Sequence, residues 1–214
     1  MNVLVFILEM IGTVAFAVSG AAVALKKRMD IFGVAVLGVT TAVGGGVMRD
    51  LLLGKTPPAM FTDPVYALVA VVVSLVVFLP FVRRCVLSNN RVYELMLLIS
   101  DSAGLGAFAA VGTQAVMDSA YSDNLLLAVF LGTITGVGGG VLRDLLANKM
   151  PKILAKRIYA CAAIAGALIC ALLWNTAGEM WAMLACIVLT VVLRVLAAHF
   201  KWSLPRPRED EVDE

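Results

Sequence analysis

One stretch of twelve residues organises this chain, and it occurs twice: Gly44-Gly45-Gly46-Val47-Met48-Arg49-Asp50-Leu51-Leu52-Leu53-Gly54-Lys55 and, 94 residues later, Gly138-Gly139-Gly140-Val141-Leu142-Arg143-Asp144-Leu145-Leu146-Ala147-Asn148-Lys149. Nine of the twelve positions are identical, and a proline follows two places after each copy. Both copies lie in strongly apolar sequence, where an arginine and an aspartate are costly. Two such stretches at matched places indicate that the places have a function.

The composition is typical of a membrane protein. The 214 residues are 61% hydrophobic, with a mean hydropathy of +0.96, whereas a soluble domain has about 45–50% apolar residues. The net charge is only +2, and no basic run alternates with aromatics, so no nucleic-acid partner is expected. The four cysteines have no metal-ligand spacing and do not indicate a disulfide framework.

Seven segments are long and apolar enough to cross a bilayer, since a spanning helix needs about 20 residues. They are residues 3–25, 31–53, 65–82, 93–116, 124–147, 157–175 and 178–199. Their short connections predict one all-α transmembrane domain over residues 1–202, without a separate soluble module. Residues 203–214 lack apolar content and are expected to be a disordered cytoplasmic tail.

The basic residues predict the orientation of the chain. With seven spans, the first, third and fifth connections and the C-terminus lie on one side and carry thirteen lysines and arginines, against Lys55 alone on the other side. This bias places the C-terminus in the cytoplasm and the N-terminus outside. All tyrosines and tryptophans fall near predicted helix ends, where their rings are expected at the headgroup level.

The similarity between the halves extends beyond the twelve-residue stretch. Glu9 aligns with Asp101 at an offset of 92, and Tyr66 aligns with Tyr159 at an offset of 93. Each unit (about 3–82 and about 93–175) therefore has three spans, and the seventh is unpaired. An odd number of spans forces the two units into opposite orientations, which predicts an inverted repeat.

The glycine triplets Gly44–Gly46 and Gly138–Gly140 predict a kink or break in the second and fifth spans, because each glycine costs a helix about 1 kcal/mol relative to alanine. A break frees backbone groups that must face protein or a water-filled cavity. The alternative is close helix packing, which small residues permit. Two matched triplets, each followed by Arg-Asp, favour a permeation or binding role.

The two Arg-Asp pairs need partners or water in the membrane, since a central arginine costs roughly 2.5–3.5 kcal/mol. Adjacent residues point about 100° apart on a helix. We therefore hypothesise pairing across the repeats, Arg49 with Asp144 and Arg143 with Asp50. The alternative is that each arginine extends to the nearer interface.

Two acids and several hydroxyl groups are further candidates. Glu9 fits an interface position, whereas Asp101, flanked by two serines, is expected deeper and is a candidate for lining a polar path. Hydroxyl groups could replace part of a cation's water shell, although they more often bond their own helix backbone. These candidates are Ser19, Thr40, Thr41, Thr133 and Thr135.

No enzyme or cofactor pattern is present. A serine protease needs a serine–histidine pair, and the only histidine, His199, lies near the end of the last span. An aspartyl protease needs two buried aspartates in a Gly-x-Gly-Asp setting, which Asp101 lacks. The sequence contains no nucleotide loop, zinc spacing or haem-type histidine pair, so no cofactor is expected.

The doubled Gly-Gly-Gly-x-x-Arg-Asp motif, the arrangement of three plus three plus one spans and the length resemble the prokaryotic branch of the trimeric intracellular cation (TRIC) channel family. The resemblance covers residues 1 to about 202. It implies a homotrimer in a prokaryotic inner or plasma membrane, with an hourglass-shaped pore in each protomer and helices kinked at the glycines. Arg49 and Arg143 would lie near the constriction.

The same resemblance also implies which ions the channel conducts and which lipid does not gate it. Monovalent cations, chiefly potassium, pass between the repeats. Animal members bind an inositol lipid through a lysine at the position of Gly139, so that type of lipid gating is not expected here. Some bacterial relatives are linked to the transport of glycine.

We therefore expect a potassium and sodium channel, in contact with membrane lipids, with one pore per protomer between the repeats. A transporter of glycine or a similar small solute is the alternative, and a scaffolding role is a third. The residues expected to line or gate the pore are Glu9, Ser19, Thr40, Thr41, Arg49, Asp50, Asp101, Thr135, Arg143 and Asp144.

Overall fold

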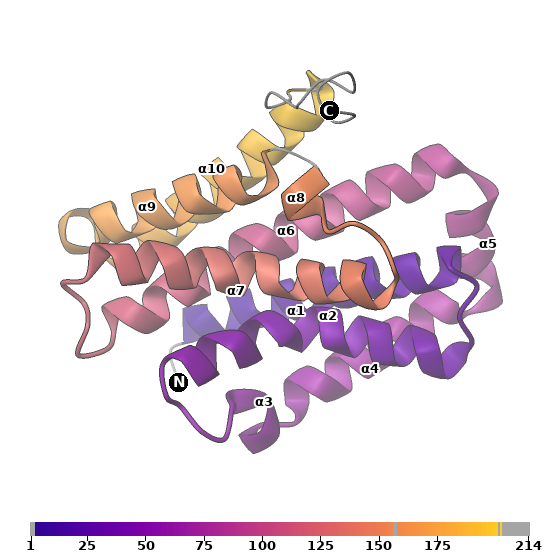
Figure 1. Ribbon diagram of the computed structural model, residues 1–214, viewed down its shortest axis with the longest axis horizontal. Coiled ribbons are helices and arrows are strands. Elements are labelled where there is room, and N and C mark those ends of the chain that lie inside the picture. Colours follow the sequence, from indigo (N-terminus) through magenta and orange to yellow (C-terminus); the bar gives the residue numbers. More distant parts are fainter. Residues whose placement is uncertain (1–2, 156–157, 201, 203–214) are drawn as a thin grey trace, which may run out of the picture.

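The structure is a computed structural model that describes residues 3–155, 158–200 and 202, and in that part of the chain every regular element is a helix (Figure 1). Six long helices are α1 (Val3–Lys26), α2 (Ile31–Leu52), α6 (Asn90–Met117), α7 (Leu125–Leu146), α9 (Tyr159–Ala177) and α10 (Glu179–His199). Four shorter ones are α3 (Ala59–Thr62), α4 (Val65–Phe78), α5 (Pro80–Ser88) and α8 (Lys152–Ala155). The predicted all-α class is confirmed; the predicted tail, 203–214, lies outside the described residues.

The two copies of the repeated stretch lie on helices that begin in the same way. The Asp30 carboxylate accepts a hydrogen bond from the Gly33 N–H at 2.7 Å, and the Asn124 side chain accepts one from the Leu127 N–H at 3.0 Å. Such caps satisfy N–H groups that have no partner within the first turn. The equivalent caps fix α2 and α7 in the same register relative to their glycine triplets.

The third predicted span, residues 65–82, is not one straight helix. It divides into α4 and α5, which are bent by 69° relative to each other. Pro80 lacks an N–H group and disfavours helical backbone at the residue before it, and Leu79 is accordingly extended, with φ −53° and ψ 142°. By length, α4 spans only about 21 Å at 1.5 Å per residue, less than the hydrocarbon thickness of about 30 Å.

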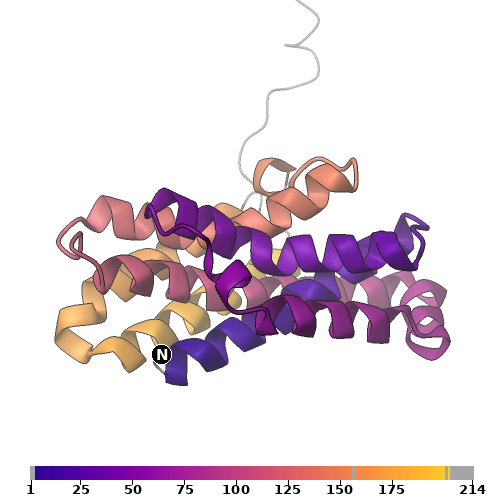
Figure 2. The same ribbon diagram turned by 90° about the horizontal axis from the view of Figure 1, so that it is seen from below.

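Two three-helix repeats form the molecule, and one helix is added to them. In the first repeat α1, α2 and α4 pack on one another, and in the second α6, α7 and α9 make the same set of contacts. α1 runs opposite to α6, and α2 runs opposite to α7 (Figure 1). α4 and the α9–α10 pair flank the central helices on different sides (Figures 1 and 2). α10 packs on α9 and α6, and it has no counterpart in the first repeat.

The aromatic pair at the centre follows the inverted symmetry. The Phe16 ring lies against Gly104, and the Phe108 ring lies against Gly12, so each repeat provides one ring and one glycine. The ring centroids are 5.5 Å apart, and both side chains are buried. A Cβ atom at Gly104 would collide with the Phe16 ring, and one at Gly12 would lie only 3.0 Å from the Phe108 ring. The two repeats are thus closely packed along their common axis.

The glycine triplets form the crossing of α2 and α7. A Cβ atom on Gly45 would collide with the backbone carbonyl of Thr135, and one on Gly139 would collide with the carbonyl of Thr41. Both helices are continuous through the triplets, so the predicted helix break is wrong. The contact between the two backbones offsets the helical cost of the glycines, as in the packing alternative. A kink without a break stays a prediction.

Candidate functional site

A first polar cluster lies between α1, α2 and α4, and it contains one of the repeated Arg-Asp pairs. Arg49 Nη1 lies 3.2 Å from Glu9 Oε1, and Arg49 Nε lies 2.9 Å from Asp50 Oδ1. The Tyr66 hydroxyl donates to Glu9 Oε2 at 2.6 Å. The backbone N–H of Ala59 donates to the other Asp50 oxygen at 2.9 Å. We call Glu9, Arg49, Asp50 and Tyr66 the first cluster.

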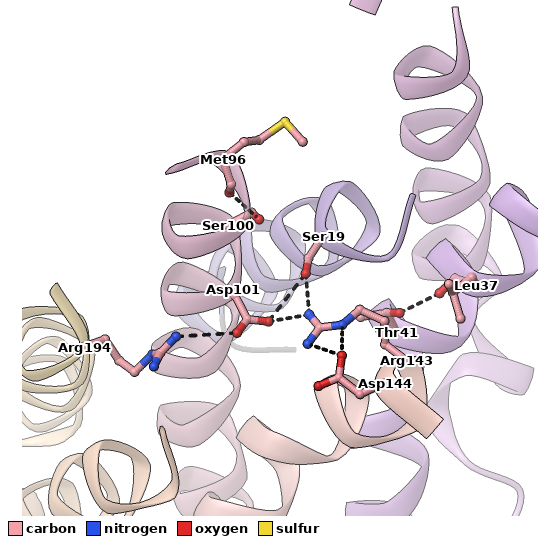
Figure 3. A network of polar contacts seen from close by, with 9 residues as sticks. All are labelled: Ser19, Leu37, Thr41, Met96, Ser100, Asp101, Arg143, Asp144 and Arg194. Atoms are coloured by element: carbon pink, nitrogen blue, oxygen red, sulfur yellow. Dashed lines mark hydrogen bonds and ion pairs between the residues drawn. The ribbon is translucent and has the colours of Figure 1, made fainter. Parts of the chain in front are cut away.

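A second cluster lies at the corresponding place in the second repeat (Figure 3). The Arg143 guanidinium donates to Asp144 Oδ1 through Nε at 2.9 Å, and Nη1 donates to both Asp101 Oδ1 and the Ser19 hydroxyl. Arg194, on α10, places Nη2 3.7 Å from the other Asp101 oxygen. Its guanidinium carbon lies 4.7 Å from the centroid of the Tyr159 ring. We call Asp101, Arg143, Asp144, Tyr159 and Arg194 the second cluster.

The pairing of the arginines corrects the sequence-based hypothesis. Arg49 pairs with Glu9 and Asp50, and Arg143 pairs with Asp101 and Asp144, so each arginine pairs within its own repeat. The hypothesis failed because it counted only the 100° between adjacent positions, whereas a long arginine side chain folds back onto its neighbour. Extension to the interface is also wrong for Arg143, whose side chain is 0% exposed.

The acids and hydroxyl groups take the following positions. Asp101 is fully buried, as expected, and Glu9 binds Arg49 and Tyr66. The interface position of Glu9 stays a prediction. Thr41, Thr133 and Thr135 each donate to the carbonyl four residues earlier, which is the backbone-bonding alternative. Ser19 instead joins the second cluster from the first repeat. Thr40 is half-buried on α2.

Sequence reasoning missed three members of the clusters. Tyr66 and Tyr159 were expected only as headgroup-level aromatics, and that depth stays a prediction. Both are buried inside the bundle, and the Tyr66 hydroxyl bonds the acid of its own repeat, Glu9. Their matched offset was the available signal. Arg194 was not among the predicted site residues, although its isolation in an apolar segment was a signal that it has a buried partner.

The clusters differ in formal charge. The first has two carboxylates and one guanidinium, which gives −1. The second has two carboxylates and two guanidinium groups, which gives 0, because α10 adds Arg194. Among the described residues, no three His, Cys, Asp or Glu side chains are grouped so as to hold a metal ion.

The clusters also differ in packing. A cavity of about 40 Å³ adjoins the first cluster, enough for about three water molecules. Its polar lining comes from Glu9, Thr13, Arg49, Asp50 and Tyr66. Beside Gly46 the nearest atom to an added Cβ is Arg49 Nη2 at 4.0 Å, whereas beside the matched Gly140 it is the Tyr159 hydroxyl at 2.7 Å. The tyrosine thus fills in the second repeat a space that stays open in the first.

The two tyrosine hydroxyls differ in their hydrogen bonding, because the acidic side chains beside them differ in length. Tyr66 bonds Glu9, but the buried hydroxyl of Tyr159 has no hydrogen-bond partner among the described residues. The acid that matches Glu9 is Asp101, whose side chain is one methylene shorter. The second repeat compensates with Arg194 over the Tyr159 ring, an attractive cation–π arrangement.

The fold and the two buried clusters define a class: a polytopic helical membrane protein built from inverted three-helix repeats, with ionised groups inside the bundle. The sequence profile of a family described as glycine transporter matches residues 6–81 and 98–175. A curated relative, the UPF0126 inner membrane protein YadS of Escherichia coli K12, is 39% identical over 204 residues, which cover 95% of each chain.

Solved structures agree with these matches. A chain from a study of conductance through TRIC cation channels is 42% identical, covers 94% of this chain and 96% of its own, and has a TM-score of 0.82. The TRIC trimeric intracellular cation channel orthologue of Rhodobacter sphaeroides is 33% identical, covers 92% and 98%, and has a TM-score of 0.84. The chain belongs to the prokaryotic TRIC channel family, and the glycine transporter profile matches this same chain.

Membership confirms the resemblance drawn from the doubled motif. The chain is a multi-pass integral membrane protein of the prokaryotic inner-membrane type. At the level of the family it is not an enzyme, since the solved relatives are described as channels.

Proposed function

We propose that this protein is a channel for monovalent cations, potassium and sodium, with one path per protomer between the two repeats. The observation that carries the proposal is the first cluster, which has a net formal charge of −1 and adjoins a partly open cavity between α1, α2, α3 and α4. Ionisable groups within membrane segments mark ion pathways by default. The description of the solved relatives as cation channels supports the same conclusion.

The cavity has the chemistry that a partly dehydrated cation needs. Glu9, Asp50 and Tyr66 line it, and carboxylate and hydroxyl oxygens replace part of an ion's water shell. Arg49 holds both carboxylates in place through its ion pairs. Its positive charge also leaves a single excess negative charge, which attracts a monovalent ion without trapping it.

Opening of the path involves the crossing of α2 and α7. In this structure Gly45 and Gly139, which have no side chain, allow the backbones of α2 and α7 to lie in contact. We propose that bending at the two triplets separates the helices there, because three glycines in a row give each helix a weak point. The predicted kinks then belong to the conducting state.

A homotrimer in a lipid bilayer is the proposed assembly, because the Rhodobacter sphaeroides relative is described as trimeric. Large apolar side chains are exposed along the outer helices, among them Leu68, Val72 and Val188. These surfaces suit contact with lipid or with neighbouring protomers.

The second candidate is a transporter of glycine, which the family description favours. The cavity carries groups of both signs, so the carboxylates of Glu9 and Asp50 could bind an ammonium group while Arg49 binds a carboxylate. A zwitterion would thus find complementary charges on one wall.

Electrical recording separates the two candidates. Purified protein in a planar bilayer between unequal KCl solutions is expected to show discrete current steps that reverse near the potassium potential. Saturable uptake of labelled glycine into proteoliposomes, without such steps, would replace the channel by the carrier. Fluxes no larger than those of protein-free liposomes, for both solutes, would contradict both and leave a scaffolding role.

A further inference from the structure

The two clusters allow an internal comparison, because the inverted repeat presents the same set of groups twice. In each repeat an acid on the first helix lies beside an arginine, an aspartate and a tyrosine from the other two helices. One charged group of the second cluster has no counterpart in the first: Arg194, which α10 supplies.

The Arg194 guanidinium shows what the acid–tyrosine pair can bind. It lies 3.7 Å from Asp101 and 4.7 Å from the centre of the Tyr159 ring. The carboxylate and the ring face both attract positive charge. In the second repeat, therefore, a monovalent cation that belongs to the chain itself occupies this pair and makes the cluster neutral.

The first repeat has the same pair, Glu9 and Tyr66, but no helix equivalent to α10. It has an open space instead: the cavity of about 40 Å³ beside Glu9, Asp50 and Tyr66. The carboxylates there exceed the guanidinium groups by one. An unbalanced charge inside a bundle is costly unless a counter-ion or water compensates it.

We propose that this cavity is a binding site for one small monovalent cation, which takes the role that Arg194 has in the second repeat. The inference rests on the proposed function and deepens it by assigning the place where the transported cation is held. The ligands are the oxygens of Glu9 and Asp50, with the ring and hydroxyl of Tyr66 beside them. The cation is either an alkali ion or the ammonium end of glycine, which share the same chemistry of recognition.

A divalent ion fits this site poorly. Calcium takes about six to eight oxygens and usually several full carboxylates. Here both carboxylates already bind Arg49, and one also bonds Tyr66. One excess negative charge matches one monovalent ion.

Anomalous diffraction with rubidium, a potassium substitute, tests the site directly. Crystals of the full-length protein grown in RbCl are expected to show a rubidium peak beside Glu9 and Asp50, and none beside Asp101. Glu9→Gln removes the excess charge and is expected to abolish the peak. Arg194→Gln gives the second cluster a net charge of −1 and is expected to create a new peak beside Asp101.

A solution measurement covers variants that do not crystallise. At constant ionic strength, replacing choline with potassium is expected to raise the thermal unfolding midpoint of the wild type and of Glu94→Gln, but not of Glu9→Gln. Glu94→Gln is the matched control, because it makes the same chemical change at an exposed position on α6 outside both clusters. Equal potassium effects in the wild type and Glu9→Gln would overturn the proposal.

The outcomes also separate this site from the channel proposal. Potassium currents without a rubidium peak in the cavity would overturn the site and leave the channel. A peak without currents would keep the site and overturn the channel. Loss of the peak on adding glycine would identify the ammonium group as the natural occupant, whereas a peak that glycine does not affect identifies the alkali ion.

Discussion

At the scale of single residues, the three glycines of each triplet have different tasks. Gly45 and Gly139 give room to a backbone carbonyl of the opposite helix, whereas Gly46 borders the cavity and meets nothing closer than 4.0 Å. The sequence could predict that the triplets matter, because they are repeated. It could not predict which glycine is packed, since this depends on how two helices distant in the chain cross.

The difference predicts opposite effects of two similar substitutions. Gly139→Ala places a methyl group on the Thr41 carbonyl, and such overpacking typically costs about 1–3 kcal/mol. Gly46→Ala meets no atom and gains about 0.5–1 kcal/mol of helix preference. Thermal unfolding in detergent is expected to give a lower midpoint for Gly139→Ala and an equal or higher one for Gly46→Ala. Equal midpoints for the two variants would contradict the crossing described here.

The charged residues show where prediction from sequence reached its limit. The alignment of Glu9 with Asp101 pointed to both acids and the apolar surroundings pointed to the arginines, and in the structure each acid lies in an ion pair with an arginine of its own repeat. The partners were wrong, because angular position on a helix says where a side chain begins and not where a flexible arginine ends. Arg143, which reaches Asp144, Asp101 and Ser19, illustrates the difference.

At the scale of elements, the six long helices follow from length and hydropathy, and their bounds agree closely with the predicted spans. The short helices α3 and α8 escaped prediction because four residues are too few for a periodic pattern. The bend before α5 was foreseeable from Pro80, which was instead included in a straight span. The packing of α10 was not foreseeable, because a helix without a repeat mate has no internal reference.

The α9–α10 contact gives the prediction at this scale. Gly166 lies against Thr190 Oγ1 and the Cys186 carbonyl. A Cβ atom added at Gly166 would collide with Thr190 Oγ1 and would lie 3.0 Å from the Cys186 carbonyl oxygen. Gly166→Ala is expected to separate the two helices and destabilise the protein by about 1–3 kcal/mol. Thr190→Ala removes the nearest of the three obstructing atoms, so the double variant is expected to recover part of the loss. If the fall in the unfolding midpoint of the double variant equals the sum of the falls of the two single variants, the contact is refuted.

At the scale of the whole molecule, the odd number of spans in each unit predicted the inverted repeat. The opposite directions of α1 and α6 agree with it (Figure 1). The side of the membrane on which each end lies stays a prediction, since it rests on the distribution of lysine and arginine.

Cysteine labelling tests this orientation. In a chain with the exposed Cys85 and Cys161 replaced by serine, Lys55→Cys is expected to react with a membrane-impermeant maleimide on intact cells. Arg84→Cys, also at an exposed position, is the matched variant on the opposite side and is expected to react only after permeabilisation. The reverse pattern would invert the proposed topology.

The helix α10, which has no counterpart in the first repeat, makes the two halves of the molecule unequal. A primitive three-helix unit that inserted both ways up and dimerised would have presented identical acid-rich chambers to the two compartments. Fusion of two such units alone would keep that equivalence. The addition of one helix with one arginine ends the equality of charge between the two clusters. For the proposed cation path, this asymmetry predicts currents of different size at equal and opposite voltages.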